Sequence, residues 1–379
     1  MRIKLPAALL CIATVSTLVI SCKKNAPPFC NCDPNNIIVT QTVFAQGLNN
    51  PRGLKFGPDG DLYVAEGGIG GSNSSQGLCT QVPEVGPYTG SPNGSRILKI
   101  GKNGDIITVA DNLPSSETTP ASGTLISGVG DIAFVGNTVY GVLAGAGCSH
   151  GVPSIPNGVI KVNHDKTWSM IADLSEFQMN NPVKNPNPGD FEPDGTWYSM
   201  QNVDGNLYAL EPNHGELDKI TTGGQISRVI DISAFEGHIV PTAMIFHDGN
   251  FYVGNLDVFP IVPGSASVYK ITPQGKISVF ATGFSTILGV AFDEIGGLYV
   301  LENTTGNPFP TPGTGDIIRV DPDGSRLTIV SGLNLPTAMI FGPDEKLYVS
   351  NWGFGPPAVG GGQVLQLDLS CAKTNHFKK

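Results

Sequence analysis

A pair of short apolar segments on either side of a glycine turn recurs along the chain. In its clearest form, residues 53–66 read as a strand, the turn Gly57-Pro-Asp-Gly60 and a second strand. A turn that ends in a left-handed glycine is typical of antiparallel hairpins. Related segments follow at 131–143, 197–210, 243–254, 290–301 and 338–350. The repetition predicts one β-hairpin in every unit.

Two further apolar segments follow each hairpin, so each unit has four predicted strands. Repeats of about 45–50 residues with four strands each indicate a β-propeller. We therefore predict an all-β, six-bladed propeller with four antiparallel strands per blade. The predicted strands are 54–56, 62–65, 96–100 and 106–110; 131–134, 139–143, 159–162 and 168–172; 197–200, 207–210, 217–220 and 226–230; 243–246, 251–253, 268–271 and 277–281; 289–292, 298–301, 317–320 and 327–330; 338–341, 347–349 and 364–367.

The last unit lacks a fourth strand, whereas residues 37–46 read as a strand without a unit. Residues 42–48 also resemble the fourth-strand segment 278–284. We expect the N-terminal strand to complete the last blade, because this leaves no open sheet edge between the chain ends. Two insertions interrupt the period: a long loop at 67–94, and 174–194, which we expect to contain one short helix.

The N-terminus has the features of an export signal. Two basic residues precede an apolar run at 5–20, too short for a stable membrane span, and Leu18-Val-Ile-Ser-Cys22 resembles a bacterial lipobox. We predict a lipoprotein-type signal peptide at 1–21, lipid on Cys22, a tether at 22–39, the propeller at 40–371 and a tail at 372–379. The alternative is ordinary secretion with a free Cys22. The expected location is the bacterial cell envelope, facing the periplasm or the exterior.

Composition and cysteines narrow the choice of partners. A formal net charge of −10 without a basic cluster argues against nucleic acid and against attraction to anionic lipid. Membrane contact is therefore expected only through the lipid, and the protein is expected to be a monomer. Disulfides are permitted in an exported protein. Cys79 and Cys148 lie in corresponding loops of adjacent blades and form a candidate disulfide, and Cys30 or Cys32 is expected near Cys371.

Polar residues gather where the second strands end, on the face that carries the long loops. A ring of carboxylates and amides there suits a hard cation such as Ca²⁺ or a polar ligand. The alternative is that Asn, Asp and Glu serve as turn formers at these positions. The candidate ligand-binding residues are Glu66, His150, His214, Asn255, Asp257, Glu302, Asn303, Asn351 and Trp352.

The sequence contains no evident catalytic site. No histidine lies near a nucleophile motif. The starts of the innermost strands, where lactonase-like propellers place metal ligands, offer one carboxylate, Asp131, and also Arg52, which would repel a cation.

Several longer runs resemble the ScyD/ScyE family of exported bacterial propellers, with an NHL- or TolB-like general form. The residues that carry the resemblance are 47–60, 238–244, 251–254, 259–271 and 279–284. The resemblance implies an exported six-bladed propeller and no agreed reaction. A pigment-pathway accessory is a third possibility, which rests on this resemblance alone.

The leading hypothesis is a non-catalytic module that binds a small polar ligand or a protein. The alternative is a metal-assisted hydrolase, lyase or isomerase that acts on a small polar or carbohydrate-derived substrate.

Overall fold

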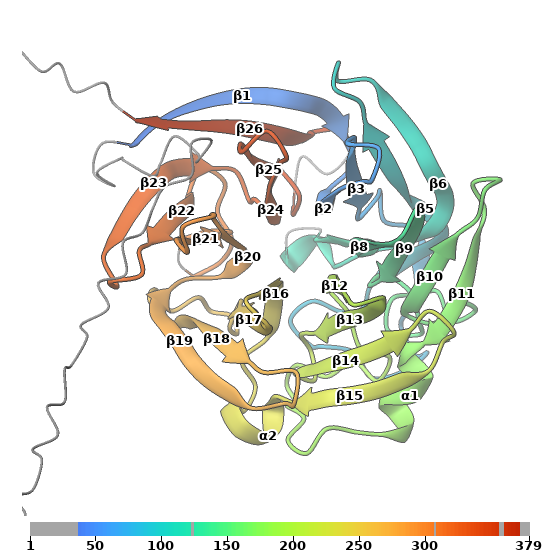
Figure 1. Ribbon diagram of the computed structural model, residues 1–379. Coiled ribbons are helices and arrows are strands. Elements are labelled where there is room, and N and C mark those ends of the chain that lie inside the picture. Colours follow the sequence, from blue (N-terminus) through green and yellow to red (C-terminus); the bar gives the residue numbers. More distant parts are fainter. Residues whose placement is uncertain (1–36, 123–124, 307, 356–359, 372–379) are drawn as a thin grey trace, which may run out of the picture.

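Six β-sheets surround a central axis in the computed structural model, which describes residues 37–122, 125–306, 308–355 and 360–371 (Figure 1). Within each sheet the neighbouring strands are antiparallel, and the innermost strands face the axis. The predicted all-β, six-bladed propeller with four strands per blade is confirmed.

The first blade is larger than the sequence predicts. Its third and fourth strands are 12 residues long each, and their ends pair with two additional short strands. Residues 89–95, expected in a loop, belong to the third strand. Register shifts between Ser91 and Ile97 disturb the alternation that would have identified a strand. The elements are β2 (Pro51–Phe56), β3 (Leu62–Glu66), β4 (Asn73–Ser74), β5 (Thr89–Ile100), β6 (Ile106–Glu117), a short 3-10 helix (Pro120–Ser122) and β7 (Ile126–Ser127).

Blades two to five follow the predicted order of strands. The first strand of blade three begins at Ser199 instead of residue 197, and Trp197 is buried in the core between blades two and three. The strands are β8 (Val129–Val135), β9 (Thr138–Leu143), β10 (Gly158–Val162), β11 (Trp168–Asp173), β12 (Ser199–Val203), β13 (Asn206–Glu211), β14 (Glu216–Thr221), β15 (Ile226–Asp231), β16 (Pro241–His247), β17 (Asn250–Asn255), β18 (Ala266–Ile271), β19 (Ile277–Phe284), β20 (Ile287–Phe292), β21 (Leu298–Glu302), β22 (Gly315–Val320) and β23 (Arg326–Leu333).

The last blade combines both ends of the described chain. It contains β24 (Ala338–Phe341), β25 (Leu347–Asn351), β26 (Gly362–Cys371) and, outermost, β1 (Ile37–Leu48). The β1 strand pairs with β26 from Ile37 opposite Cys371 to Leu48 opposite Gly362. Residues 37–39, which the sequence assigns both to the end of the tether and to the first strand, are thus part of the sheet, as their β-branched side chains favour. The leader, Cys22, Cys30 and Cys32 lie outside the described residues.

The hydrophobic core is divided among the six interfaces between adjacent blades. Each interface buries one apolar cluster with side chains from both blades. The cluster between the last and first blades, for example, joins Leu48 and Val364 to Leu54 and Leu98. Burial of one such side chain contributes about 1.5–3 kcal/mol. The ring is therefore held together at every interface, including the one that closes it.

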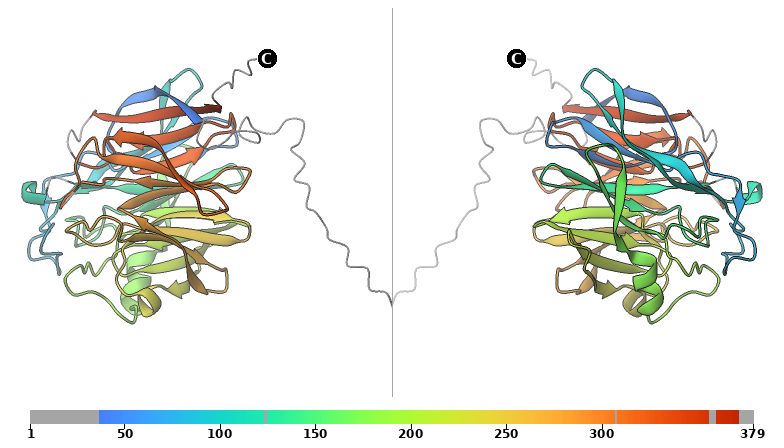
Figure 2. Two further views of the ribbon diagram at one scale, coloured as in Figure 1. Left: turned by 90° about the vertical axis from the view of Figure 1, so that its left-hand side faces the viewer. Right: turned by 90° about the vertical axis from the view of Figure 1, so that its right-hand side faces the viewer.

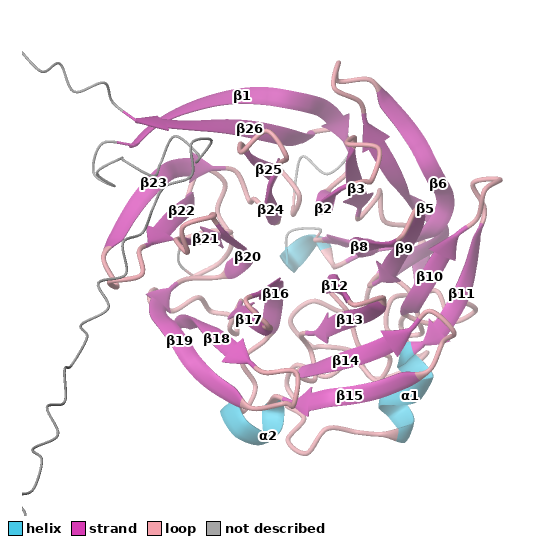
Figure 3. Cartoon of the chain, viewed as in Figure 1, coloured by secondary structure: helices cyan, strands magenta, loops and turns pink. Residues whose placement is uncertain are grey.

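Two short helices lie at the rim of the ring (Figure 3). The predicted insertion at 174–194 begins with α1 (Leu174–Asn180), whose first turn is capped because the side chain of Asp173 accepts a hydrogen bond from the backbone N–H of Glu176 at 2.8 Å. The second helix, α2 (Ser233–Glu236), follows β15. Across the described part of the chain, no helix is both long and apolar enough to cross a membrane.

The long connections protrude on one face of the ring (Figure 2). They include the segment between β3 and β5, the 3-10 helix after β6 and the segment between α1 and β12. We call this side the loop-rich face.

Candidate functional site

Most of the polar residues at the ends of the second strands hold their own blades together. Glu66 accepts a hydrogen bond from the backbone N–H of Asn49 at 2.8 Å, and Asn351 accepts one from Asn334 at 2.8 Å. Glu302 accepts one from Ser285 at 2.5 Å. In each case the bond fixes the segment that leads into the innermost strand. These side chains are buried and engaged by the backbone.

Of the remaining candidates, four are held by contacts with other parts of the fold and two line a cavity. Asn255 and Asn303 each donate a hydrogen bond to a backbone carbonyl, of Ile239 and Pro336 respectively, both at 2.9 Å. The ring of His214 stacks on Phe191, and His214 Nε2 lies 2.8 Å from the carbonyl oxygen of Glu192. The backbone N–H of Trp352 donates a hydrogen bond to the carbonyl oxygen of Asn334. Of the nine predicted residues, only His150 and Asp257 line the cavity described next.

A cavity of about 410 Å³ opens on the axis at the loop-rich face; we call it the axial cavity. Small-molecule sites typically measure about 300–1,000 Å³. Its polar lining residues, which we call the polar wall, include residues of both insertions, and its apolar lining residues come from the first insertion (Val82 and Val85) and from the loops after β17 and before β16. The lining includes Arg52, Tyr88, His150, Asp190, Glu192, Thr196, Tyr198, Asn213, Val240, Leu256, Asp257, Val258, Phe259 and Phe354.

Four residues of the polar wall form a connected group, the cavity cluster: Tyr88, His150, Glu192 and Thr196. His150 Nε2 lies 3.0 Å from Glu192 Oε2 and 3.3 Å from Thr196 Oγ1. Thr196 donates to the same carboxylate oxygen at 2.7 Å, and the Tyr88 hydroxyl also bonds Glu192. The rings of Tyr88 and His150 pack with centroids 4.4 Å apart. Three separate blades thus contribute to one hydrogen-bonded group.

The cluster shifts the acidity of its members in opposite directions. Burial by itself would raise the pKa of Glu192, but the adjacent His150 and the hydrogen bonds from His150, Thr196 and Tyr88 lower it below its usual value. Burial and the nearby Glu192 raise the pKa of Tyr88 well above its usual value. Glu192 is therefore a carboxylate acceptor and Tyr88 a phenol donor at neutral pH.

Ser116 orients the imidazole from behind. Its hydroxyl lies 2.6 Å from His150 Nδ1, but the side chain is fully buried and does not line the cavity. A ligand in the axial cavity would meet the Nε2 edge of His150. Ser116 is thus a positioning residue and not a nucleophile facing the cavity.

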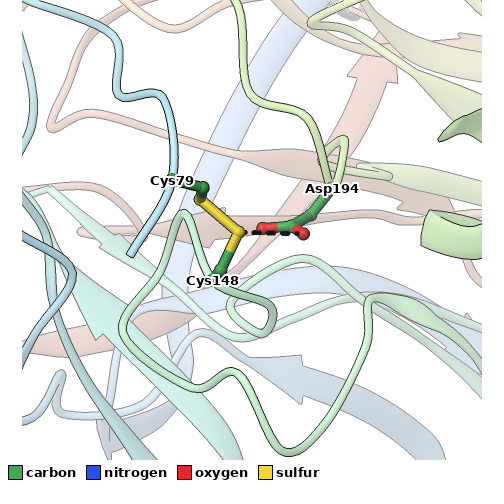
Figure 4. Close-up of side chains that lie close together, drawn as sticks. All are labelled: Cys79, Cys148 and Asp194. Atoms are coloured by element: carbon green, nitrogen blue, oxygen red, sulfur yellow. Dashed lines mark hydrogen bonds between the residues drawn. A yellow bond between two sulfur atoms is a disulfide. The ribbon is translucent and has the colours of Figure 1, made fainter. Parts of the chain in front are cut away.

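A disulfide between Cys79 and Cys148 fastens the loops that carry Tyr88 and His150, as the sequence predicts. Asp194 completes this junction: its Oδ1 lies 3.4 Å from Cys148 Sγ, and its Oδ2 accepts the backbone N–H of Ser149 at 2.7 Å (Figure 4). Among the described residues, these three form the sole group of three potential metal ligands in close proximity, and two of them are joined in the disulfide. The junction is structural, and it places Glu192, two residues before Asp194, beside His150.

A second histidine–carboxylate pair lies in the same region. His238 Nε2 is 2.6 Å from Asp190 Oδ2, and Asn213 donates to Asp190 Oδ1 at 3.1 Å. Asp190 and Asn213 line the axial cavity. Asn213 also accepts the backbone N–H of Glu192 at 2.7 Å, which links the two pairs.

The axial cavity meets a smaller space, of about 200 Å³, between the innermost strands; we call it the lower channel. Tyr198, Thr242 and Leu288 line both. Asp131 faces the lower channel, where Lys55 lies 3.7 Å away and the backbone N–H of Met200 bonds it at 2.8 Å. Asp131, the single carboxylate at the start of an innermost strand, is therefore bonded within the lower channel and does not line the axial cavity.

Several cavity residues were not among the sequence candidates. Tyr88, Asp190 and Glu192 come from the two insertions, which have no periodicity to indicate their course. One sequence signal did point to Tyr88: the predicted disulfide brings the first insertion to the loop that contains His150.

The comparisons with known proteins show the fold. No protein-family model matches the sequence, and no curated protein matches it. A putative oxidoreductase (glucose dehydrogenase) from Thermus thermophilus is 16% identical, with a TM-score of 0.55, over 87% of this chain and 100% of that one. The PQQ-bound aldose sugar dehydrogenase of Streptomyces coelicolor is 14% identical, with a TM-score of 0.53, over 89% and 99%.

A gluconolactonase from Xanthomonas campestris is 10% identical, with a TM-score of 0.51, over 87% of this chain and 89% of that one. The chain therefore shares the six-bladed propeller fold of these structures. At such low identity the likeness extends to the fold and not to the chemistry.

Proposed function

We propose that this protein is an exported propeller that binds a small polar ligand in the axial cavity without altering it. The observation that carries the proposal is the cavity itself, which is of small-molecule size and is lined by both hydrogen-bonding and apolar side chains. The polar wall offers grouped donors and acceptors, and Val258 and Phe259 offer an apolar surface. This combination suits a hydroxylated compound with exposed carbon–hydrogen faces.

The nature of the structural neighbours supports the choice of first ligands. The glucose dehydrogenase, aldose sugar dehydrogenase and gluconolactonase described above are all named for sugars or sugar lactones. We therefore propose carbohydrates and their derivatives as the ligand class.

The proposed location is the bacterial cell envelope, with lipid on Cys22 as the anchor. The Cys79–Cys148 disulfide supports an oxidising compartment. The lipobox-like segment supports the anchor, and the resemblance to the ScyD/ScyE family supports export. Mass spectrometry of the N-terminal peptide of the mature protein tests the anchor. We expect Cys22 to carry two or three acyl chains.

Binding is tested by thermal-shift and calorimetric titration with a panel of mono- and disaccharides and sugar acids. Val258→Trp should block the cavity mouth and abolish binding, because Val258 lines the cavity and is 41% exposed. Val262→Trp is the matched control: it lies in the same loop, is 61% exposed and does not line the cavity. Equal binding by both variants would contradict the proposal. Addition of a chelator in the same titrations tests the prediction of Ca²⁺.

The second candidate function is catalysis of proton transfer, as in a lyase or isomerase. The cavity cluster favours it, because His150, Glu192 and the Tyr88 hydroxyl are joined at the cavity wall. A bound compound that is recovered unchanged by NMR supports the binding module. Conversion that stops in His150→Gln, while binding persists, supports the enzyme.

A further inference from the structure

Arg52 lines the axial cavity at the start of β2, and we call the part of the cavity formed by this innermost strand its floor. The residue is 3% exposed, and its guanidinium carbon lies 5.5 Å from the ring centroid of Tyr198 and 5.2 Å from that of Phe354. It donates one hydrogen bond to the Tyr198 hydroxyl at 3.0 Å and one to the carbonyl oxygen of Ile126. A guanidinium has five N–H donors, so it retains donors after these two bonds.

Arg52 differs from the other buried or partly buried arginines of the described chain in having no carboxylate partner. Arg319, which is 4% exposed, pairs with Asp293 and Asp321. Arg96 pairs with Glu66, and Arg228 with Glu216. The partners of Arg52 are a phenol, a peptide carbonyl and two aromatic faces. Because burial of an unpaired charge is costly, this position calls for an anion.

The distribution of charge in the cavity places that anion at the floor. Among the described lysines and arginines, Arg52 alone lines the axial cavity. Glu192 and Asp190 are each paired with a histidine on the polar wall. Of the other two lining carboxylates, Glu84 is exposed and Asp257 is partly exposed, and both lie on loops. An anionic group would thus be attracted to the floor and repelled from the loops at the mouth, which fixes its orientation.

We propose that Arg52 binds a carboxylate of the ligand, so that the axial cavity takes a small hydroxy acid of the sugar-acid class. This inference rests on the proposed function and names its ligand class. The carboxylate meets the guanidinium at the floor, where a charge-assisted pair in a site of low dielectric is strong. The hydroxyl groups meet Thr196, Asn213 and Asp190, and the carbon chain packs on Val258 and Phe259.

The experiment compares acids with neutral molecules of the same shape on the purified full chain. D-Gluconate is titrated against D-gluconamide, and D-galacturonate against D-galactose, at constant ionic strength. We expect each acid to bind about 10- to 100-fold more tightly than its neutral counterpart, as one hydrogen-bonded charge pair contributes. This comparison needs no variant. Equal affinities within both pairs would overturn the proposal.

Two variants assign the effect to Arg52. Arg52→Gln should reduce the preference for the acid to near unity, while the exposed Arg326→Gln should leave it unchanged. A preserved preference in Arg52→Gln would overturn the proposal. Inorganic phosphate that binds Arg52 more tightly than gluconate would also overturn it, by showing that the floor selects phosphate instead of carboxylate.

The outcomes separate this inference from the proposed function. If neutral sugars bind and the acids do not, the inference fails and the binding function stands. If neither class binds, both fail.

Discussion

The cavity cluster and a second buried group of carboxylates contact opposite ends of the same insertion, residues 174–194. The second group, the interior cluster, consists of Gln178, Glu216, Asp218 and Arg228. Gln178 from α1 donates to Glu216 at 3.0 Å, and Arg228 bonds both Glu216 and the carbonyl oxygen of Asn181. It holds the beginning of the insertion against blade three, whereas the cavity cluster contains Glu192 from near its end.

The two clusters differ in the balance of their charges. Glu192 has His150 beside it and several donors, which lower its pKa. In the interior cluster two carboxylates share one guanidinium. Burial and the adjacent Asp218 raise the pKa of Glu216 to about 9, and burial raises the pKa of Asp218 to about 7. Within the described chain, Asp218 Oδ1 has no hydrogen-bond partner.

This difference separates a binding wall from a structural anchor. The carboxylate that faces the cavity is compensated and ready to accept a ligand donor without a change of protonation. The carboxylates of the interior cluster line neither the axial cavity nor the lower channel, and their charge is under-compensated. We therefore expect changes in the interior cluster to affect stability, and changes in the cavity cluster to affect binding.

The largest effect is expected from Arg228→Met. It removes the bonds to the insertion and the cation that compensates the buried carboxylates, of which Asp218, with a pKa of about 7, is ionised at pH 8. The free energy of unfolding should fall by about 3–4 kcal/mol, as when a buried charge loses its partner. Urea denaturation at pH 8 measures this. Arg326→Met is the control, since Arg326 is exposed and packs on the Phe284 ring. A loss no greater than that of the control would show that Arg228 is not the anchor.

The disulfide gives the next largest effect and tests the other end of the insertion. Replacement of Cys79 and Cys148 together by serine should cost about 2–4 kcal/mol, the typical range for a bond that closes a long loop in the unfolded chain. It should also weaken ligand binding, since the loops of Tyr88 and His150 are no longer joined. Calorimetry with the best ligand of the panel measures both quantities. Unchanged affinity would show that the cavity cluster is held in place without the disulfide.

The sequence predicts the fold far better than the site, for a physical reason. Each blade repeats one strand pattern, so residues such as Leu54 and Leu62 are read from local alternation. Tyr88 and Glu192 lie in insertions, whose course depends on tertiary contacts such as Asp194 with Ser149. For the site, only the pairing of Cys79 with Cys148 carries non-local information in the sequence itself. Arg52 is visible as a charge at a strand start, but its lack of a carboxylate partner is a property of the folded ring.

A smaller effect is expected from Asp218→Asn, and it depends on pH. A carboxyl with a raised pKa in the folded state contributes stability at low pH that is lost as pH rises through the folded value. The wild type should thus lose stability from the ordinary carboxyl pKa up to about pH 7 through Asp218 and up to about pH 9 through Glu216, and the variant should lose on the order of 2 kcal/mol less. Urea denaturation across this range measures both slopes. Parallel slopes would show that Asp218 keeps an ordinary pKa.

The smallest effect on stability is expected from Glu192→Gln, with the opposite dependence on pH. Because the pKa of Glu192 is lowered in the folded state, its ionised form contributes stability above its usual pKa, and this contribution is lost as pH falls through the folded value. The variant should therefore be about 1 kcal/mol less stable than the wild type at pH 7, and the difference should diminish as pH falls below the usual pKa of a glutamate. It should also bind the ligand more weakly at pH 7, where Asp218→Asn should bind it normally. Urea denaturation measures the stability of each variant, and calorimetry measures the affinity of each for the ligand. If Asp218→Asn weakened binding as much as Glu192→Gln, the interior cluster would be part of the binding site and the distinction between the two clusters would be wrong.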